Sequence, residues 1–287
     1  MKAWAIRHLL WPAMEMRGNR IRKYLAEMTE TAALPADRVR ALQRERLRDL
    51  LRFAVANVPA YRPYADQVLA RLDADPEQAL RALPVLTKRA FNDRRDDFFA
   101  DGADRSALIA NRTGGSTGEP TVFYMDRFTV EHYEAARWRG LGWHGIRIGD
   151  PSVMIWGSSI ELTQMQSRKY WLKERLLKNR IMIPAYALKP ESVERYVRQI
   201  RAFRPHYLYG YASALHLMAE LMLERGLTPG LKLKAVVSTS ETLHPHHREA
   251  IAAAFGCKVV NEYGARDAGI LAFECPHGGM HITADNA

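Results

Sequence analysis

Apolar residues recur at helical spacing in several parts of the chain. The clearest stretch is 36–56, where the apolar positions are Val39, Leu42, Leu47, Leu50, Leu51 and Val55. Further helices are predicted near residues 64–72, 127–141, 164–178, 190–203, 212–226 and 244–255. Thr87 stands directly before another short helical stretch, where its hydroxyl is placed to cap the first turn.

Short apolar runs predict strands between these helices. Four runs lie in the second half of the chain, at residues 152–156, 207–209, 235–238 and 258–261. Because they alternate with predicted helices over residues 150–270, they favour an α/β fold whose sheet is parallel in that part. Residues 107–110 and 121–124 flank a glycine-rich loop and predict a hairpin, and residues 280–283 predict a last strand.

Composition narrows the classes of function. The 287 residues are 47% hydrophobic and 26% charged, as in ordinary globular proteins. The net charge of +10 would suit nucleic acid, but acidic residues are interleaved with the basic ones and no nucleic-acid motif accompanies them, so no nucleic-acid partner is predicted. No apolar stretch reaches the length of about 18 residues that a membrane span needs, so no stable membrane insertion is expected. Two cysteines make no disulfide framework, which favours the cytoplasm.

The strongest local motif is the segment 113–120, with the sequence TGGSTGEP. Its small residues let backbone N–H groups approach an anion, which suits a phosphate cradle, although a simple hairpin connection fits equally well. Glu119 stands where a Walker loop would need lysine. The segment also matches G-x-S-x-G around Ser116, but a nucleophile elbow needs a helix next, and strand-forming residues follow. A serine hydrolase using Ser116 with His277, His281 and Asp267 is therefore the least favoured alternative.

A second motif follows the predicted strand at residues 258–261. Here Tyr263 offers a ring for stacking on a base, Gly264 allows close approach, and Asp267 is a carboxylate suited to Mg²⁺. The end of a parallel strand is where α/β sheets bind ligands. Taken by itself, the segment 261–269 is more simply explained as a polar turn with Arg266 and Asp267 in solvent.

The two motifs, in this order and spacing, resemble the phenylacetate–CoA ligase and CapK-like branch of the adenylate-forming superfamily, which includes acyl-CoA synthetases. The resemblance covers nearly the whole chain and extends to segments 57–61, 83–88, 149–150, 209–213, 238–242 and 274–282. It implies the α/β fold of that family's large N-terminal domain. We expect a helical region over residues 1–75 packed on the body, and a nucleotide- and acid-binding α/β domain over residues 76–287.

The resemblance also implies an activity. Such enzymes convert a small-molecule carboxylic acid and ATP into an acyl-adenylate, and then usually transfer the acyl group to CoA. The implied nucleotide-binding residues are Thr113, Gly114, Gly115, Ser116, Thr117, Gly118, Ser240, Glu241, Glu262, Tyr263 and Gly264. Thr117 and Asp267 are the implied catalytic residues. Asp267 would hold magnesium at a position where the family usually has Glu.

Three further expectations concern what the chain lacks or leaves open. Cys257, Cys275, His277 and His281 are suitable zinc ligands, but Ala265 stands where relatives often carry Cys, so zinc is not favoured. The family's ribose-binding Asp, its hinge and its lid lysine are absent, which implies a chain that ends before the C-terminal lid domain and adenylates slowly. A non-catalytic remnant that binds nucleotide or a partner stays open, and the sequence indicates neither the acid nor an oligomeric state.

Overall fold

The computed structural model describes residues 2–113, 121–157 and 168–284. The chain forms two compact units. One unit combines Met1–Ala26 with Glu131–Asn286, and the other is Glu27–Val130 together with Ala287. The domain boundary predicted at residue 75 stays a prediction.

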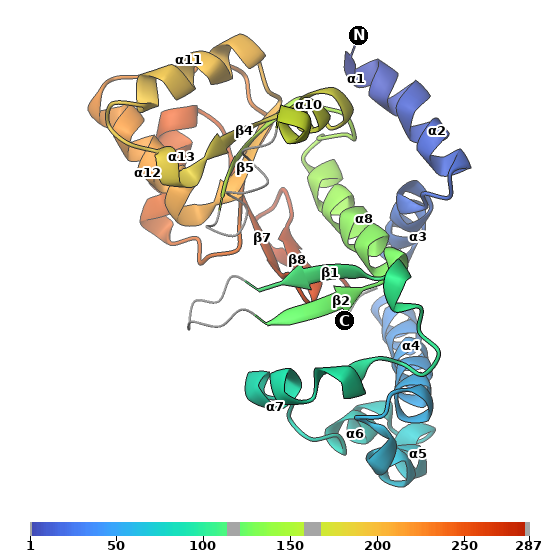
Figure 1. Ribbon diagram of the computed structural model, residues 1–287. Coiled ribbons are helices and arrows are strands. Elements are labelled where there is room, and N and C mark those ends of the chain that lie inside the picture. The colour runs from blue at the N-terminus through green and yellow to red at the C-terminus, as the bar shows by residue number, and fades with distance from the viewer. Residues whose placement is uncertain (1, 114–120, 158–167, 285–287) are drawn as a thin grey trace. The chain divides into compact units, whose positions relative to one another are not determined.

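The unit that contains Glu131–Asn286 is built on a mixed sheet (Figure 1). Within the described residues the sheet has seven strands, in the order β4 (Arg180–Pro184), β3 (Ser152–Trp156), β5 (Tyr207–Tyr211), β6 (Ala235–Thr239), β7 (Val259–Ala265), β8 (Gly269–Glu274) and β9 (Met280–Ile282). The pairs from β4 to β7 are parallel, and β7, β8 and β9 pair antiparallel. The α/β fold with a parallel central region is therefore confirmed.

The same unit also contains several helices and helical turns. They are α1 (Lys2–Ala5), a π-helical turn (Ile6–Leu10), α2 (Trp11–Met16), the start of α3 (Ile21–Thr31), α8 (Arg127–Trp143), α10 (Arg168–Leu177), a 3₁₀ turn (Ala185–Ala187), α11 (Val193–Phe203), α12 (Ala212–Glu224) and α13 (Pro245–Phe255). Figure 1 shows α11, α12 and α13 gathered together. Side chains of alternate strand positions, such as Val153, Ile155 and Leu208, form one buried core with these three helices.

The unit Glu27–Val130 has a smaller core of its own. It contains α4 (Ala36–Asn57), α5 (Ala65–Leu72), α6 (Pro76–Arg81), α7 (Lys88–Asp93), three 3₁₀ turns (Arg62–Tyr64, Arg95–Phe98 and Arg105–Ala107) and the hairpin of β1 (Ile109–Arg112) and β2 (Val122–Met125). Leu51 and Val55 of α4 pack with Val68 and Leu72 of α5. The Thr87 hydroxyl accepts a hydrogen bond from the N–H of Ala90 at 3.1 Å, so the predicted cap is confirmed.

Most predicted elements are present with small changes of boundary. The hairpin is confirmed, with Arg112 opposite Val122, and the strand predicted at residues 280–283 is β9. Strands β4 and β8 were not predicted, because each is a short run that becomes a strand only through its pairing with β3 or β7. No helix in the described part of the chain combines the length and the apolar character that a membrane crossing requires.

Candidate functional site

The carboxyl ends of the parallel strands meet at one edge of the sheet. This edge carries Trp156 at the end of β3, Tyr211 at the end of β5, Ser240 just after β6, and Tyr263 near the end of β7. In open α/β sheets, ligands bind in the crevice outside these ends. We call these four residues and their neighbours the carboxyl-end edge.

A buried acidic network joins three of the strands beneath this edge. The Glu262 side chain, 1% exposed, accepts hydrogen bonds from the hydroxyls of Tyr209 and Thr239, the latter at 3.0 Å. The Arg137 guanidinium of α8 lies 3.5 Å from the other Glu262 oxygen and 5.4 Å from the centre of the Tyr209 ring. Burial raises the pKa of Tyr209, so its hydroxyl stays protonated and donates. The network therefore holds β5, β6 and β7 in register at the site.

This arrangement bears on Glu262 as a predicted nucleotide-binding residue. Its side chain is buried, accepts hydrogen bonds from Tyr209 and Thr239, and forms an ion pair with Arg137. The side chain of Tyr263, the next residue, is exposed. A strand sends successive side chains to opposite faces, which accounts for the difference. The direct contact predicted for Glu262 stays a prediction; what the structure gives this residue is a role in positioning its neighbour.

The turn between β7 and β8 is fixed by two close approaches. A Cβ at Gly264 would collide with the carbonyl oxygen of Gly269, so only glycine fits there. The Tyr133 hydroxyl of α8 donates to the backbone carbonyl of Asp267 at 2.9 Å. Burial, with a smaller effect of the Asp267 carboxylate, raises the pKa of Tyr133 and keeps it a donor. The Asp267 side chain itself is exposed.

Tyr133 was missed by the sequence analysis. It lies within a helical stretch with no motif around it, more than 100 positions from the turn that it supports. Only the pairing of α8 with the β7–β8 turn reveals this role.

The chain leaves β6 through Ser240 and Glu241, and the backbone at Ser240 is unusual. Ser240 has φ of 67°, a left-handed backbone that residues other than glycine adopt at a cost. The Glu241 carboxylate accepts a hydrogen bond of 2.8 Å from the N–H of Ser213, in the first turn of α12. A carboxylate at a helix N-terminus satisfies an otherwise unpaired donor. Both residues are exposed at the carboxyl-end edge, where the resemblance predicted them to bind nucleotide.

Aromatic rings line the neighbouring strand ends. Trp156 stacks on Tyr211, with ring centres 4.2 Å apart, and lies 6.0 Å from Tyr209. The strands approach closely here, since a Cβ at Gly210 would lie 2.6 Å from the carbonyl oxygen of Ile155. The edge therefore offers a planar apolar surface next to the polar segments at Ser240 and Tyr263.

The glycine-rich loop falls mostly outside the described residues, which include Thr113 but not Gly114, Gly115, Ser116, Thr117 or Gly118. At its base, the N–H of Thr113 donates to the carbonyl of Thr121, and the N–H of Thr121 donates to the Thr113 hydroxyl, both at 3.0 Å. The strand β2 follows, which supports the argument against a nucleophile elbow at Ser116.

The predicted zinc ligands are not gathered into one group. Cys257 packs against the core of α11–α13, and burial raises the pKa of its thiol to about 11. Zinc binds the thiolate, so this environment disfavours a metal. Cys275 and His277 lie in the β8–β9 turn and His281 lies in β9, and the four residues do not form a ligand cluster among the described residues.

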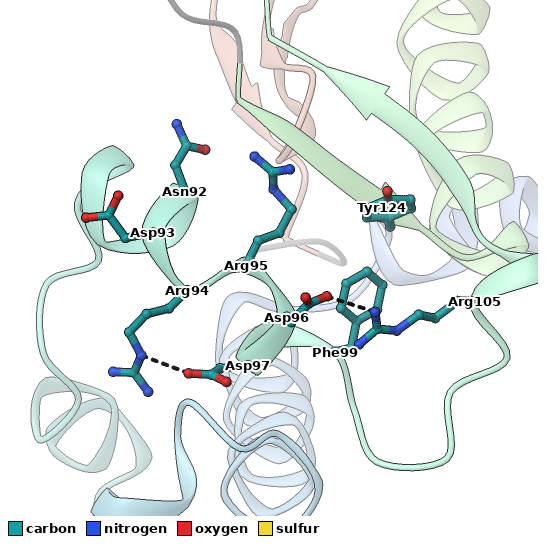
Figure 2. A pocket seen from close by; sticks show the side chains of 9 residues that line it. All are labelled: Asn92, Asp93, Arg94, Arg95, Asp96, Asp97, Phe99, Arg105 and Tyr124. Carbon is teal, nitrogen blue, oxygen red and sulfur yellow. Dashed lines mark hydrogen bonds and ion pairs between the residues drawn. The ribbon is translucent and has the colours of Figure 1, made fainter.

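A hollow of about 580 Å³ lies in the unit Glu27–Val130 (Figure 2). Its lining includes three arginines and three aspartates, with Arg94 paired to Asp97 and Arg105 paired to Asp96, each at 2.8 Å. The Arg105 guanidinium also lies 3.9 Å from the centre of the Phe99 ring. Because the lining charges balance, the hollow has no net charge that would select an ionic ligand, and we assign it none.

The sequence was compared with protein families and with curated proteins. No family model matches the chain. CapK of Staphylococcus aureus is 27% identical over 204 residues, which cover 71% of this chain and 45% of CapK. Phenylacetate–coenzyme A ligases of Thermus thermophilus and Pseudomonas putida are 27% and 28% identical, over 82% and 84% of this chain and 52% and 53% of those proteins. This chain is similar in sequence to CapK and to the phenylacetate–coenzyme A ligases. The predicted resemblance is thereby confirmed.

Solved structures agree on the fold. A 2-hydroxyisobutyryl-CoA ligase in complex with 2-HIB-AMP and CoA matches with a TM-score of 0.65 and 22% identity, over 88% of this chain and 55% of that one. Its open conformation matches with a TM-score of 0.63 and covers 60% of that chain. The chain has the fold of this part of the ligase, and it spans about half the length of the curated relatives that it matches.

Proposed function

We propose that this chain forms the nucleotide- and acid-binding part of an ATP-dependent acid–CoA ligase. In the first step a carboxylate oxygen of the acid attacks the α-phosphorus of ATP, and pyrophosphate leaves. In the second step the CoA thiol attacks the acyl carbon of the adenylate, and AMP leaves. The observation that carries the proposal is the carboxyl-end edge, where an exposed Tyr263 is held in place by the buried Glu262 network.

Each predicted residue has a role in this proposal. Tyr263 would stack on adenine, with Gly264, Ser240 and Glu241 beside it. The loop 113–118, with Thr117 as the predicted catalytic hydroxyl, would bind the phosphates. Trp156 and Tyr211 would offer the acid a planar apolar surface. Adenylyl transfer depends on positioning and charge neutralisation, which suits a site without a strong nucleophile.

Magnesium is the metal that this chemistry requires. The Asp267 carboxylate is exposed and offers the hard oxygen that Mg²⁺ prefers, and Tyr133 fixes the backbone beneath it, so the residue fits the role. When bound, the ion would neutralise charge on the phosphates. ATP, magnesium and CoA are thus the proposed cofactors and co-substrate. The cytoplasm is the proposed location, since Cys257 and Cys275 are both free.

The test is calorimetric titration of the purified chain with Mg·ATP. Tyr263→Ala should weaken ATP binding about 5- to 150-fold, because aromatic stacking on a base contributes about 1–3 kcal/mol. Tyr263→Phe keeps the ring and should bind nearly as tightly as the parent. Phe53→Ala removes a ring that is 53% exposed on α4 and should change nothing.

Saturable ATP binding that ignores Tyr263→Ala would contradict the adenine assignment, and no binding at millimolar ATP would contradict the function. Pyrophosphate release and thioester formation, measured over a panel of aryl and fatty acids, then separate the alternatives. Binding without pyrophosphate release would indicate a nucleotide-binding protein without turnover. A fluorophosphonate probe that labels Ser116 would indicate a hydrolase instead.

A further inference from the structure

Three histidines from two helices meet at one end of the α12–α13 pair. His216 lies in the second turn of α12, and His246 and His247 lie in the first turn of α13. Each offers a ring nitrogen within 4.8 Å of the other two. The ring centres of His216 and His247, and of His246 and His247, are 4.3 Å apart. Across the described ranges, no other three His, Cys, Asp or Glu residues meet this closely.

A carboxylate orients one of these rings. The Nε2 atom of His216 lies 3.2 Å from the carboxylate of Glu220, one turn further along α12. This contact favours the ring proton on Nε2, which leaves a lone pair on Nδ1. The second ring nitrogen of a metal-bound histidine almost always donates to a carboxylate, a backbone carbonyl or water, and Glu220 would supply the carboxylate here.

Two of the ring nitrogens lack any partner among the described residues. The Nδ1 atoms of His216 and His247 are buried and accept or donate no hydrogen bond. Buried polar atoms are normally satisfied, so the two nitrogens, on rings whose centres are 4.3 Å apart, are available to an ion.

We propose that His216, His246 and His247 bind one divalent transition-metal ion, with Zn²⁺ as the ion of choice. Imidazole nitrogen suits zinc, whereas magnesium and calcium prefer oxygen ligands. Two nitrogens on one zinc ion lie about 3.3 Å apart, given bonds of about 2.0–2.1 Å and tetrahedral angles. The rings must therefore close in slightly, and the exposed His246 has room to turn. Three histidines leave a fourth position for water.

The site would act as a cross-link between α12 and α13. It lies next to the segment that leaves β6, where Glu241 already bonds to the first turn of α12. Zinc would hold that turn and the start of α13 together. The proposal concerns residues outside the predicted nucleotide contacts and does not depend on the proposed ligase activity.

The experiment uses the full chain, stripped with a chelator and dialysed, and titrated calorimetrically with ZnCl₂ at pH 7.5. One zinc per chain is expected. His246→Asn with His247→Asn should weaken binding at least about a hundredfold, and Glu220→Gln, which only changes the partner of His216, should weaken it about 10- to 100-fold. The matched control, Cys275→Ser with His277→Asn, removes potential ligands at the β8–β9 turn and should leave binding unchanged.

A second measurement does not rely on the double histidine variant being folded. Hydrogen exchange of the parent chain should slow on adding zinc at residues 212–216 and 244–248, and Glu220→Gln should reduce that effect. The proposal is overturned if the parent shows no saturable zinc binding. It is also overturned if only the Cys275→Ser, His277→Asn variant loses zinc, or if exchange slows elsewhere and not at these residues.

Discussion

Removing the Glu262 carboxylate should destabilise the unit that contains it far more than an ordinary substitution. Glu262→Ala deletes the acceptor of the Tyr209 and Thr239 hydroxyls and the anion opposite Arg137. All three partners stay behind in a site where the carboxylate was 1% exposed. The Tyr209 and Thr239 side chains are buried, so water has little access to their hydroxyls, whereas the Arg137 side chain is 29% exposed.

The magnitude follows from the number of groups left unpaired. Glu262→Ala removes the acceptor of two hydroxyls, and two hydrogen bonds to a charged group at about 1.5–3 kcal/mol each give a loss of about 3–5 kcal/mol. Arg137 adds little to this loss, because it keeps its ion pair with Glu134 at 2.9 Å. Each hydrogen bond to a charged group contributes about 1.5–3 kcal/mol, so Tyr209→Phe should cost about that much. These losses share one carboxylate. The double variant should therefore be more stable than the sum of the two single effects implies.

Tryptophan fluorescence during urea unfolding measures this unit selectively. All six tryptophans (Trp4, Trp11, Trp138, Trp143, Trp156 and Trp171) lie in Met1–Ala26 or Glu131–Asn286. With a slope of about 3 kcal/mol/M, a loss of 3–5 kcal/mol lowers the midpoint by about 1–1.7 M. Glu249→Ala, an exposed glutamate of α13, serves as the control and should stay within about 0.5 kcal/mol of the parent.

Two results would refute this reasoning. A loss below about 1 kcal/mol for Glu262→Ala would show that solvent or a neighbouring group satisfies the three partners. Strict additivity of Glu262→Ala and Tyr209→Phe would show that the two residues do not act through one network.

Two further predictions concern other parts of the same unit. Gly210→Ala should destabilise by about 1–3 kcal/mol, because its methyl group would lie 2.6 Å from the Ile155 carbonyl oxygen. Gly142→Ala is the control: the position has open space around it in α8, so the change should be neutral or stabilising by up to about 1 kcal/mol. Equal effects of the two substitutions in urea titrations would contradict the close approach. For Asp150, burial opposes ionisation, but hydrogen bonds from Lys234 at 2.7 Å and the Arg147 N–H at 3.0 Å prevail and lower its pKa. Its contribution is therefore present above the ordinary aspartate pKa of about 3.9 and is lost as the pH falls below it, so Asp150→Asn should lower stability at pH 7 and flatten the acid side of the stability profile. Parallel profiles for the two proteins would rule this out.

Elements with a strong local sequence pattern were predicted with nearly correct boundaries. The helix predicted over residues 36–56 is α4, Ala36–Asn57, and the strand predicted over residues 152–156 is β3, Ser152–Trp156. Both carry a strong periodic or apolar signal and clear flanking residues. Strand β4 has only Ile181, Met182 and Ile183 between Arg180 and Pro184, and its identity depends on pairing with β3.

The candidate site was predictable in its segments but not in its side-chain directions. The sequence predicts the segment 261–269 as part of the site, and Tyr263 is exposed, as its proposed role requires. That Glu262 would point into the sheet depends on Tyr209, 53 positions earlier, and on Arg137, whose position follows only from the packing of α8. The histidine cluster is likewise a product of α12 packing on α13, since His216 and His246 are 30 positions apart in the sequence.

The alternation along β7 has a consequence for how the chain can evolve. Glu262 and Tyr263 are neighbours in the sequence, yet the side chain of Glu262 is buried and that of Tyr263 faces solvent. Substitutions at position 263 can change what the edge recognises while the fold persists. Substitutions at position 262 destabilise the fold and disturb the edge at the same time. A library of variants at both positions, sorted once for expression and once for nucleotide binding, should show the difference. Variants with new specificities should carry changes at position 263 and almost none at position 262.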